Sequence, residues 1–284
     1  MALLEVADLS VEFATLAGAL RAVDRVSFDL AEGEVLGIVG ESGSGKTVAC
    51  RSILHLLPSA RARIAGGRAM FEGRDLLTLP ERELRHLRGS RLAMIFQNPS
   101  THLDPLMTVG RQVAEPLIYH RGLSAREARR EAIELLARVG IPDPGHNVDA
   151  HPHRFSGGMR QRAMIAAAIA CEPRLLIADE PTTALDVTVQ AQILRLLLDL
   201  RDRTGLSIIL ITHDLGIVAA TRGRELPSIE GQLPPLADPP PGCRFHPRCA
   251  HAEPRCETGM PLPEPATPTH ATACIRWREV MAEA

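Results

Sequence analysis

The only lysine of the chain, Lys46, lies in a glycine-rich stretch whose spacing suits phosphate binding. Residues 40–47 read GESGSGKT and fit the pattern G-x-x-x-x-G-K-[ST]. Glycines at this spacing let consecutive backbone N–H groups turn toward a bound phosphate. A compact ammonium enters such a cradle where a planar guanidinium does not fit. The stretch predicts a nucleotide site with a hydroxyl for Mg²⁺, formed by Gly40, Ser42, Gly43, Ser44, Gly45, Lys46 and Thr47.

Two consecutive acids, Asp179 and Glu180, follow the apolar run 175–178. In a protein with a phosphate loop, the first acid at the end of such a strand lies next to Mg²⁺. The second acid can polarise a water molecule for attack on the γ-phosphate. An acidic strand end without a catalytic role is the alternative interpretation, because such ends are common.

A capped, glycine-rich helix start precedes the acid pair at residues 155–162 (FSGGMRQR). Ser156 is a natural N-cap for a helix that continues through Cys171, and Gly157 and Gly158 leave the helix N-terminus bare for an anion. By itself this stretch indicates only a capped helix. Its place between a phosphate loop and an Asp-Glu strand makes the pattern far more specific.

Alternating strand and helix signals must position these residues. Strands are expected at 9–13, 23–30, 34–39, 91–96, 175–178 and 207–211, and helices at 48–57, 124–139 and 188–204. The runs 175–178 and 207–211 are fully apolar, as expected inside a parallel sheet. Strand, crossover helix and strand in this order predict an α/β nucleotide domain. The strand before and the helix after the glycine-rich stretch also argue against a chance match in a turn.

Composition narrows the class of protein. The chain has 284 residues, a net charge of −2 and a pI of about 6.6, so no basic excess points to nucleic acid. The N-terminus carries early acids and lacks the basic region of a signal peptide. Apolar runs fall short of the roughly 20 residues that span a bilayer. We expect a soluble or peripheral protein in the cytoplasm.

Cysteine and proline gather near the C-terminus. Residues 227–268 hold twelve of the 22 prolines, and four cysteines crowd into the last fifth of the chain: Cys243, Cys249, Cys256 and Cys274. In a reducing compartment such a cluster favours a metal over disulfides. Four thiolates suit zinc or an iron–sulfur cluster, although the paired C-x-x-C spacing of structural zinc is missing. A flexible tail with incidental thiols is the alternative.

The order of these motifs resembles that of the ATP-binding cassette (ABC) ATPases. Residues 155–159 match the signature loop of that family, Gln97 the Q-loop glutamine, residues 184–186 the D-loop and His213 the switch histidine. The resemblance covers residues 1–220. It implies an α/β P-loop NTPase core with a mostly parallel sheet, an antiparallel β subdomain and a helical subdomain. The helical subdomain would span about residues 98–170.

The resemblance also implies roles at the hydrolysis centre. Lys46 and the loop amides would bind the phosphates of ATP, and Thr47, Gln97 and Asp179 would surround Mg²⁺. Glu180 would orient or deprotonate the attacking water.

Further roles follow from the way in which such domains pair. Two domains would close head to tail around two ATP molecules, so that the phosphate loop of one faces the signature loop of the other. His213 would support the γ-phosphate and the water, and Phe13 would stack on adenine. Contacts with the nucleotide are further implied for Ser156, Gly157, Gly158 and Asp186.

A closer resemblance is to the ATPase subunits of bacterial dipeptide and oligopeptide importers. It rests on residues 96–105 (FQNPSTHLDP), 151–162 (HPHRFSGGMRQR) and 242–249 (GCRFHPRC). In some relatives the C-terminal segment, here 221–284, holds a [4Fe–4S] cluster. The resemblance implies ATP-driven peptide import at the cytoplasmic face of the membrane. The implied partners are a second ATPase subunit, two permease subunits and an extracytoplasmic peptide-binding protein, without nucleic acid.

One departure from the family pattern follows His213. The family has two more strands and a helix before a Thr-Arg-Gly stretch, whereas here residues 217–220 run directly into Thr221. A missing strand–turn–strand would leave one edge of the sheet uncovered. Two alternatives stay open: a catalytically impaired partner subunit or decayed copy, and a non-transport ABC ATPase. A coiled-coil insertion, a second cassette or a basic patch would favour the latter, and the sequence has none.

Overall fold

The computed structural model describes residues 2–16, 18–183, 185–214, 240–249, 251–259, 261–267 and 270–279. The chain divides into two compact units, Met1–Gly223 and Arg224–Ala284, and each is described by itself. Within the described ranges, every helix is too short or too polar to cross a membrane.

An antiparallel sheet opens the first unit. It consists of β1 (Ala2–Thr15), β2 (Gly18–Ala31), β4 (Ala62–Phe71) and β5 (Arg74–Asp75), in the order β2-β1-β4-β5. β1 is central and pairs with β2 and with β4 along most of its length. This sheet is the antiparallel β part of the predicted fold.

A parallel sheet follows, with the strand order β3-β8-β7-β6. Its strands are β3 (Val35–Val39), β6 (Leu92–Ile95), β7 (Leu175–Asp179) and β8 (Ser207–Thr212). β7 and β8 are buried at every position, which is typical of the interior of a parallel sheet. β3 is only partly buried at every position, and among the described strands it pairs with β8 alone.

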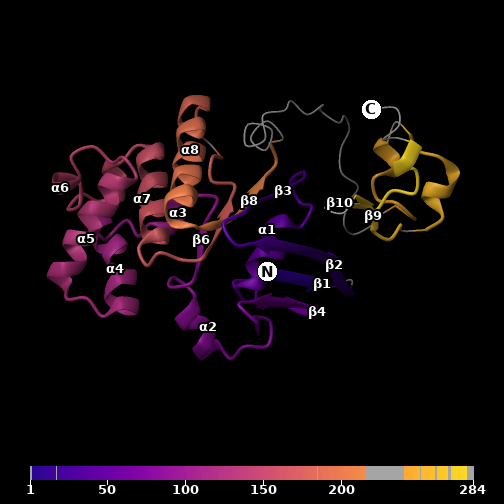
Figure 1. Cartoon of the computed structure of the whole chain (residues 1–284), viewed down its shortest axis with the longest axis horizontal. Helices are drawn as coiled ribbons and strands as arrows, with labels where there is room; N and C mark the ends of the chain where they lie inside the picture. Colours follow the sequence, from indigo (N-terminus) through magenta and orange to yellow (C-terminus); the bar gives the residue numbers. More distant parts are fainter. Residues whose placement is uncertain are drawn as a thin grey trace. The chain divides into compact units, whose positions relative to one another are not determined.

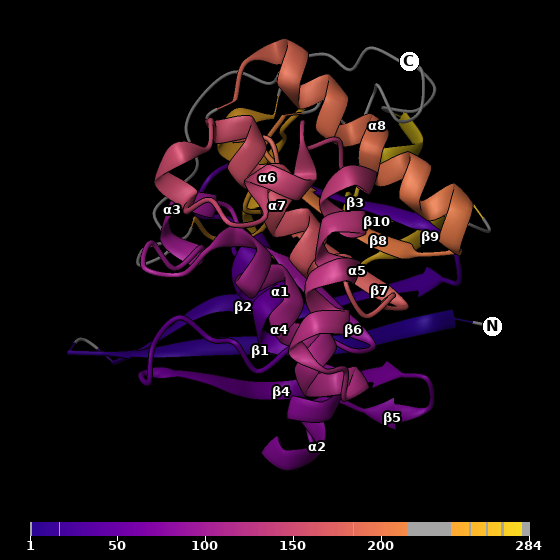
Figure 2. The same cartoon turned by 90° about the vertical axis from the view of Figure 1, so that its left-hand side faces the viewer.

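The parallel sheet lies between two hydrophobic cores because side chains alternate along each strand. On β7, Leu176 and Ala178 face the core shared with helices α4, α5, α7 and α8. Leu175 and Ile177 face the opposite core, shared with α1 and the antiparallel sheet. In Figure 2, β1 and β4 run across the lower part of the view and α8 across the top.

The helices of the first unit are α1 (Lys46–Ile53), α2 (Glu81–Leu87), α3 (Pro99–His102), α4 (Val109–Arg121), α5 (Ala125–Arg138), α6 (Pro144–Asn147), η1 (Pro152–Arg154), α7 (Gly157–Ile169) and α8 (Val187–Thr204). α4, α5 and α7 pack on one another. In Figure 1, α4, α5 and α6 gather at the end of the unit away from β1, β2 and β4. α5 begins with the predicted capping box of Ser124 and Glu127.

The predicted α/β cassette fold is confirmed, with differences at element bounds. The helix expected at 48–57 begins at Lys46 and ends at Ile53. It ends early because Leu54 is its C-cap and His55 has a left-handed φ of 52°. β1 and β2 are longer than expected, and β4 and α4 were not among the strands and helices predicted from the sequence.

The second unit has little regular structure among its described residues. It contains η2 (His246–Arg248), η3 (Pro254–Glu257) and the antiparallel pair β9 (Glu264–Thr267) and β10 (His270–Thr272). The backbone N–H of Cys243 donates to the carbonyl of Cys256 over 2.7 Å. The segment predicted to be missing after Ala220 falls outside the described residues.

Candidate functional site

The glycine-rich loop joins the end of β3 to α1. Gly43 and Gly45 have φ angles of 82° and 88°, which side-chain-bearing residues rarely adopt. A Cβ atom on Gly45 would lie 2.5 Å from the carbonyl oxygen of Ala22 on β2. Because α1 begins directly after Gly45, no side chain caps its first N–H groups. These groups are therefore available to an anion.

Lys46 folds back over this loop. Its Nζ donates to the carbonyl oxygens of Gly40 and Glu41, each over 2.6 Å, and to Ser44 Oγ over 3.2 Å. Burial lowers the pKa of Lys46, and the nearby carboxylates of Glu180 and Asp179 oppose this shift. The ammonium thus lies inside the curve of the loop, where a phosphate would replace carbonyl oxygens as its acceptor.

Thr47 and Asp179 form the oxygen donor set of the site. Thr47 Oγ1 donates to Asp179 Oδ1 over 2.7 Å, and the Asp179 side chain is fully buried at the end of β7. Burial raises the pKa of Asp179, while the bonds from Thr47 and Arg51 oppose that rise. A hydroxyl and a carboxylate at this distance fit Mg²⁺, which prefers hard oxygen ligands.

Glu180 is the centre of a polar cluster drawn from three loops. Gln97 Nε2 donates to its Oε2 over 2.7 Å, Thr183 Oγ1 donates to the same oxygen over 2.8 Å, and His213 Nδ1 lies 3.1 Å from its Oε1. Burial raises the pKa of Glu180, but these hydrogen bonds outweigh burial and leave the pKa lowered. Glu180 also has a φ of 45°, a strained conformation of the kind found at functional sites.

The signature stretch and the D-loop form a second cluster. Ser156 caps α7 by accepting from the N–H of Met159 over 3.2 Å, and Asp186 caps α8 by accepting from Val189 over 2.9 Å. A Cβ atom on Gly158 would lie 2.9 Å from a methyl group of Val189, so the start of α8 requires a glycine there. Among the described residues, no hydrogen bond or ion pair joins Ser156 or Asp186 to the phosphate loop. Ala184, in the D-loop pattern, lies outside the described residues.

Phe13 lies near the end of β1, in the strand that pairs with both β2 and β4. Its side chain is partly buried. The neighbouring strand β2 reaches the phosphate loop through the contact of Ala22 with Gly45. Phe13 is therefore on the sheet that borders the loop.

The comparisons with known proteins agree with this geometry. A family model described as "ABC transporter" matches residues 23–183, and one described as "Oligopeptide/dipeptide transporter, C-terminal region" matches residues 217–256. The chain belongs to the ABC transporter ATPase family. As a member of that family it is an ATPase that binds ATP.

Several relatives of this ABC ATPase cover almost all of it. A probable peptide ABC transporter ATP-binding protein of Sinorhizobium fredii is 47% identical over 322 residues, covering 98% of this chain and 96% of the relative. The dipeptide transport ATP-binding protein DppD of Bacillus subtilis is 44% identical over 313 residues, covering 95% and 93%. Both alignments are longer than the 284 residues of this ABC ATPase, so the relatives contain stretches that it lacks.

A solved structure supports the cassette fold of the first unit. The ATP-binding cassette MJ0796, a dimer in a post-hydrolysis state with ADP and Pi, is 29% identical with a TM-score of 0.68. The match covers 75% of this chain and 89% of that one. The expected fold class is thus confirmed by geometry as well as by sequence.

The four C-terminal cysteines line one cavity of about 170 Å³ in the second unit. Phe245, His246 and His251 line the same cavity. Among the residues that the structure describes, however, no three or more His, Cys, Asp or Glu side chains are arranged to hold a metal ion. The structure thus brings the four thiols to a common space without arranging them as the ligands of the predicted zinc or iron–sulfur centre.

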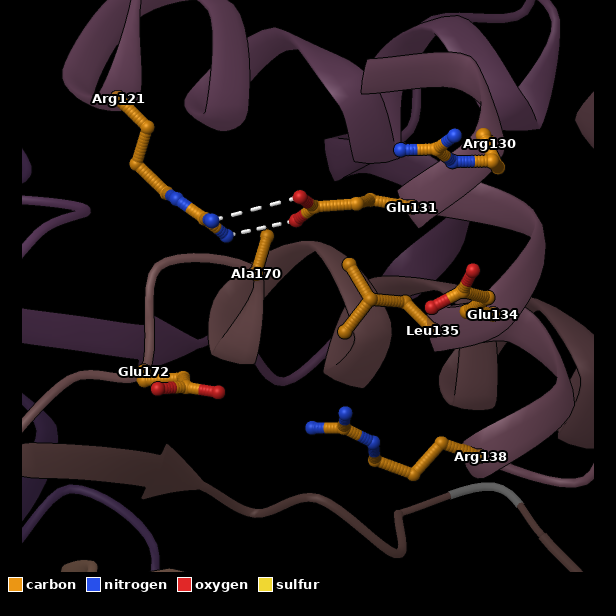
Figure 3. A pocket seen from close by; sticks show the side chains of 8 residues that line it. All are labelled: Arg121, Arg130, Glu131, Glu134, Leu135, Arg138, Ala170 and Glu172. Atoms are coloured by element: carbon orange, nitrogen blue, oxygen red, sulfur yellow. Dashed lines mark hydrogen bonds and ion pairs between the residues drawn. The ribbon is translucent and has the colours of Figure 1, made fainter. Parts of the chain in front are cut away.

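A different pocket lies between α5 and the end of α7 (Figure 3). Arg121 and Glu131 form a two-pronged ion pair across it, with N–O distances of 2.6 and 3.3 Å. Arg138 and Glu172 also line it. The pocket contains none of the predicted site residues, and its mixed charges offer no net attraction to an anion.

Sequence reasoning missed two residues of the site. Thr183 donates to Glu180, and Arg51 donates to Asp179. Arg51 could have been found from its position four residues after Thr47, because residues at i and i+4 share one face of a helix.

Proposed function

We propose that this ABC ATPase hydrolyses ATP to drive the import of dipeptides and oligopeptides through membrane permease subunits. The observation that supports the substrate class is the match of residues 217–256 to the oligopeptide/dipeptide transporter C-terminal region. A cassette fold alone leaves the cargo open. Relatives at 44–47% identity that bear peptide-transport names support the same substrate class.

In the proposed mechanism, Lys46 and the N–H groups at the start of α1 bind and orient the phosphates of ATP. Thr47 and Asp179 hold Mg²⁺, which when bound supplies positive charge against the phosphate oxygens. Glu180 accepts the proton of the attacking water at a carboxylate oxygen. His213 orients Glu180 through the contact with its Oε1.

Other assignments complete the proposal. Residues 1–220 form the ATPase domain, with a helical subdomain at about 98–170, and residues 221–284 form the importer-type C-terminal segment. Phe13 stacks on adenine, and Gln97 joins the Mg²⁺ ligands. A second ATPase subunit contributes its signature loop and D-loop, at the positions equivalent to Ser156, Gly157, Gly158 and Asp186. Two permeases and an extracytoplasmic peptide-binding protein complete a transporter in which this subunit is peripheral on the cytoplasmic face.

Uptake by cells tests the proposed cargo. A strain of the source organism that lacks the gene should lose uptake of radiolabelled di-, tri- or pentapeptides. The wild-type gene should restore uptake, whereas Glu180→Gln should not. Glu134→Gln, at an exposed acid on α5, is the matched control and should restore uptake fully. Unchanged peptide uptake in the deletion strain would contradict the proposed substrate class.

Steady-state hydrolysis distinguishes the proposal from a catalytically impaired partner subunit. Purified wild-type protein should release phosphate from ATP, and the rate should rise when its permeases are present in lipid vesicles. A rate equal to that of Glu180→Gln under both conditions would favour the impaired subunit. Stimulation by DNA or ribosomes instead of permeases would favour a non-transport ABC ATPase.

We further propose that Cys243, Cys249, Cys256 and Cys274 ligate one metal centre, with a [4Fe–4S] cluster ahead of zinc. The support is that all four line the same cavity, and the resemblance to the peptide-importer ATPases favours the cluster over zinc. Anaerobic purification followed by iron, sulfide and zinc analysis tests it. Cys243→Ser should remove the metal and Cys171→Ser, in the first unit, should not. Wild-type protein without iron or zinc would rule the centre out.

A further inference from the structure

The guanidinium of Arg51 contacts both Asp179 and Phe96, which belong to different sequence motifs. Arg51 lies on α1, one turn after Thr47, and its NH2 atom donates to Asp179 Oδ2 over 3.4 Å. Thr47 occupies the other carboxylate oxygen, Oδ1. The two oxygens of Asp179 are therefore divided between two residues on one face of the same helix.

The same guanidinium covers the ring of Phe96. The Cζ atom of Arg51 lies 5.5 Å from the ring centroid, within the range of a cation–π contact. Phe96 directly follows β6 and precedes Gln97, the residue that donates to Glu180. One side chain thus touches the buried carboxylate of Asp179 and the residue that sets the start of the Q-loop.

This arrangement extends to the signature helix. The ring of His102, on α3, is stacked on Phe96 with centroids 4.2 Å apart and an interplanar angle of 3°. Arg160, on α7, donates to Ser100 of α3 over 2.7 Å. Contacts therefore run without a break from Asp179 through Arg51, Phe96 and α3 to α7.

The chemistry of this position favours arginine. A planar guanidinium can stack on an aromatic ring with its face while its edge donates to a carboxylate, which an ammonium cannot do. The side chain is largely enclosed, with 21% of its surface exposed, and its Nε atom is buried without a hydrogen-bond partner in the structure. Leaving a buried donor unpaired is costly, so the contacts with Asp179 and Phe96 must compensate for it.

We propose that Arg51 is a positioning residue that orients Asp179 for Mg²⁺ and fixes the Q-loop through Phe96. This inference rests on the proposed function, because it assigns Mg²⁺ to Asp179. Partners of metal-ligating carboxylates typically affect metal affinity by about 10- to 100-fold when they are removed. The loss of Arg51 should therefore weaken the Mg²⁺-dependent part of nucleotide binding and leave the Mg²⁺-independent part intact.

The test is a titration of full-length protein with a fluorescent ATP analogue, in EDTA and at increasing Mg²⁺ concentration. Arg51→Met and Arg51→Lys should both raise the Mg²⁺ concentration that gives half-maximal enhancement of binding by roughly 10-fold or more. Affinity in EDTA should change little. Arg61→Met, at an exposed position before β4, is the matched control and should behave as wild type.

A double-mutant cycle tests the second contact. Phe96→Leu should shift the same Mg²⁺ midpoint, and Arg51→Met should add much less in that background than in wild type, because the two side chains act together. A merely structural role would lower Tm equally in EDTA and in Mg²⁺ without moving the midpoint, and would overturn the inference. Tighter Mg²⁺ binding by Arg51→Met would also overturn it. Wild-type protein that binds no ATP would instead refute the proposed function.

Discussion

Gln97 donates a hydrogen bond of 2.7 Å to Glu180, across 83 positions of sequence. The Gln97 amide thereby occupies Oε2 of the carboxylate that, in the proposed mechanism, accepts a proton from the attacking water. His213 lies against Oε1, so both oxygens have partners in the structure. Thr183 also donates to Oε2, so a ligand that takes over the Gln97 amide would free one of the acceptor positions on Glu180 for a water molecule.

Replacing Glu180 by Gln should separate hydrolysis from nucleotide binding. The carboxylate accepts a proton in the proposed mechanism and does not contact the phosphates, so hydrolysis should fall by about 10²–10⁴-fold. Binding of a fluorescent ATP analogue should stay within a few-fold of wild type. Phosphate release and binding are measured on the same preparations, with Glu134→Gln as the control. A variant that lost ATP binding would show that Glu180 holds the nucleotide.

Lys46→Arg should abolish ATP binding although it keeps the charge. Lys46 Nζ reaches two backbone carbonyls at 2.6 Å inside the loop, and the wider guanidinium has no room there. Equilibrium binding in Mg²⁺ is the measurement. Arg63→Lys, on β4, makes the reverse exchange at an exposed arginine that pairs with the buried Glu12, and it should leave ATP binding unchanged. Near-normal binding by Lys46→Arg would refute the phosphate role of this lysine.

The stability of metal-free protein should depend on pH through Asp179. Burial raises the pKa of Asp179 above its ordinary value of 3.8. Between pH 3.8 and the raised pKa, the folded state therefore holds a proton that the unfolded chain has released. The free energy of unfolding then falls as pH rises from 3.8 through the raised pKa and levels off above it. Asp179→Asn removes this dependence.

The expected observation is a difference in Tm between Asp179→Asn and wild type that grows as pH rises through this interval. It should become constant at higher pH. Each kcal/mol corresponds to roughly 2–4 °C for a domain of this size. Thermal melts in EDTA from pH 4 to pH 8 provide the measurement, and Asp199→Asn, at an exposed position on α8, is the control. A Tm difference that shrinks with rising pH would mean that the pKa of Asp179 is lowered in the folded state.

Much of the site could be predicted from local spacing in the sequence. Contacts between residues far apart in the sequence could not. The phosphate loop requires glycines at fixed positions, so residues 40–47 identify it without any structure. The contact of Arg51 with Asp179 joins positions 128 apart, and its only local signal is the helical spacing from Thr47. The crowding of four cysteines near the C-terminus predicted that they lie together, and they line one cavity, but their sequence positions do not fix where the thiols point within it. Helix ends set by left-handed residues, such as His55, are equally invisible to periodicity.

The partly buried strand β3, at one end of the described parallel sheet, leads to the last prediction. All five of its residues are partly buried, whereas β7 and β8 are buried throughout, and β3 pairs with β8 alone among the described strands. An unpaired strand edge is a liability that proteins normally cover. Inserting a strand–turn–strand of the kind that the family pattern implies between Ala220 and Thr221 should therefore raise Tm. A gain of about 2 kcal/mol would appear as roughly 4–8 °C.

A Gly-Ser insertion of equal length at the same position is the control, because it lengthens the chain without offering a strand. Thermal melts and light scattering of both proteins provide the comparison, since an uncovered edge also promotes association between chains. The strand insertion should raise Tm and reduce concentration-dependent association, and the Gly-Ser insertion should do neither. Equal Tm values in two folded proteins would mean that another part of the chain already covers β3.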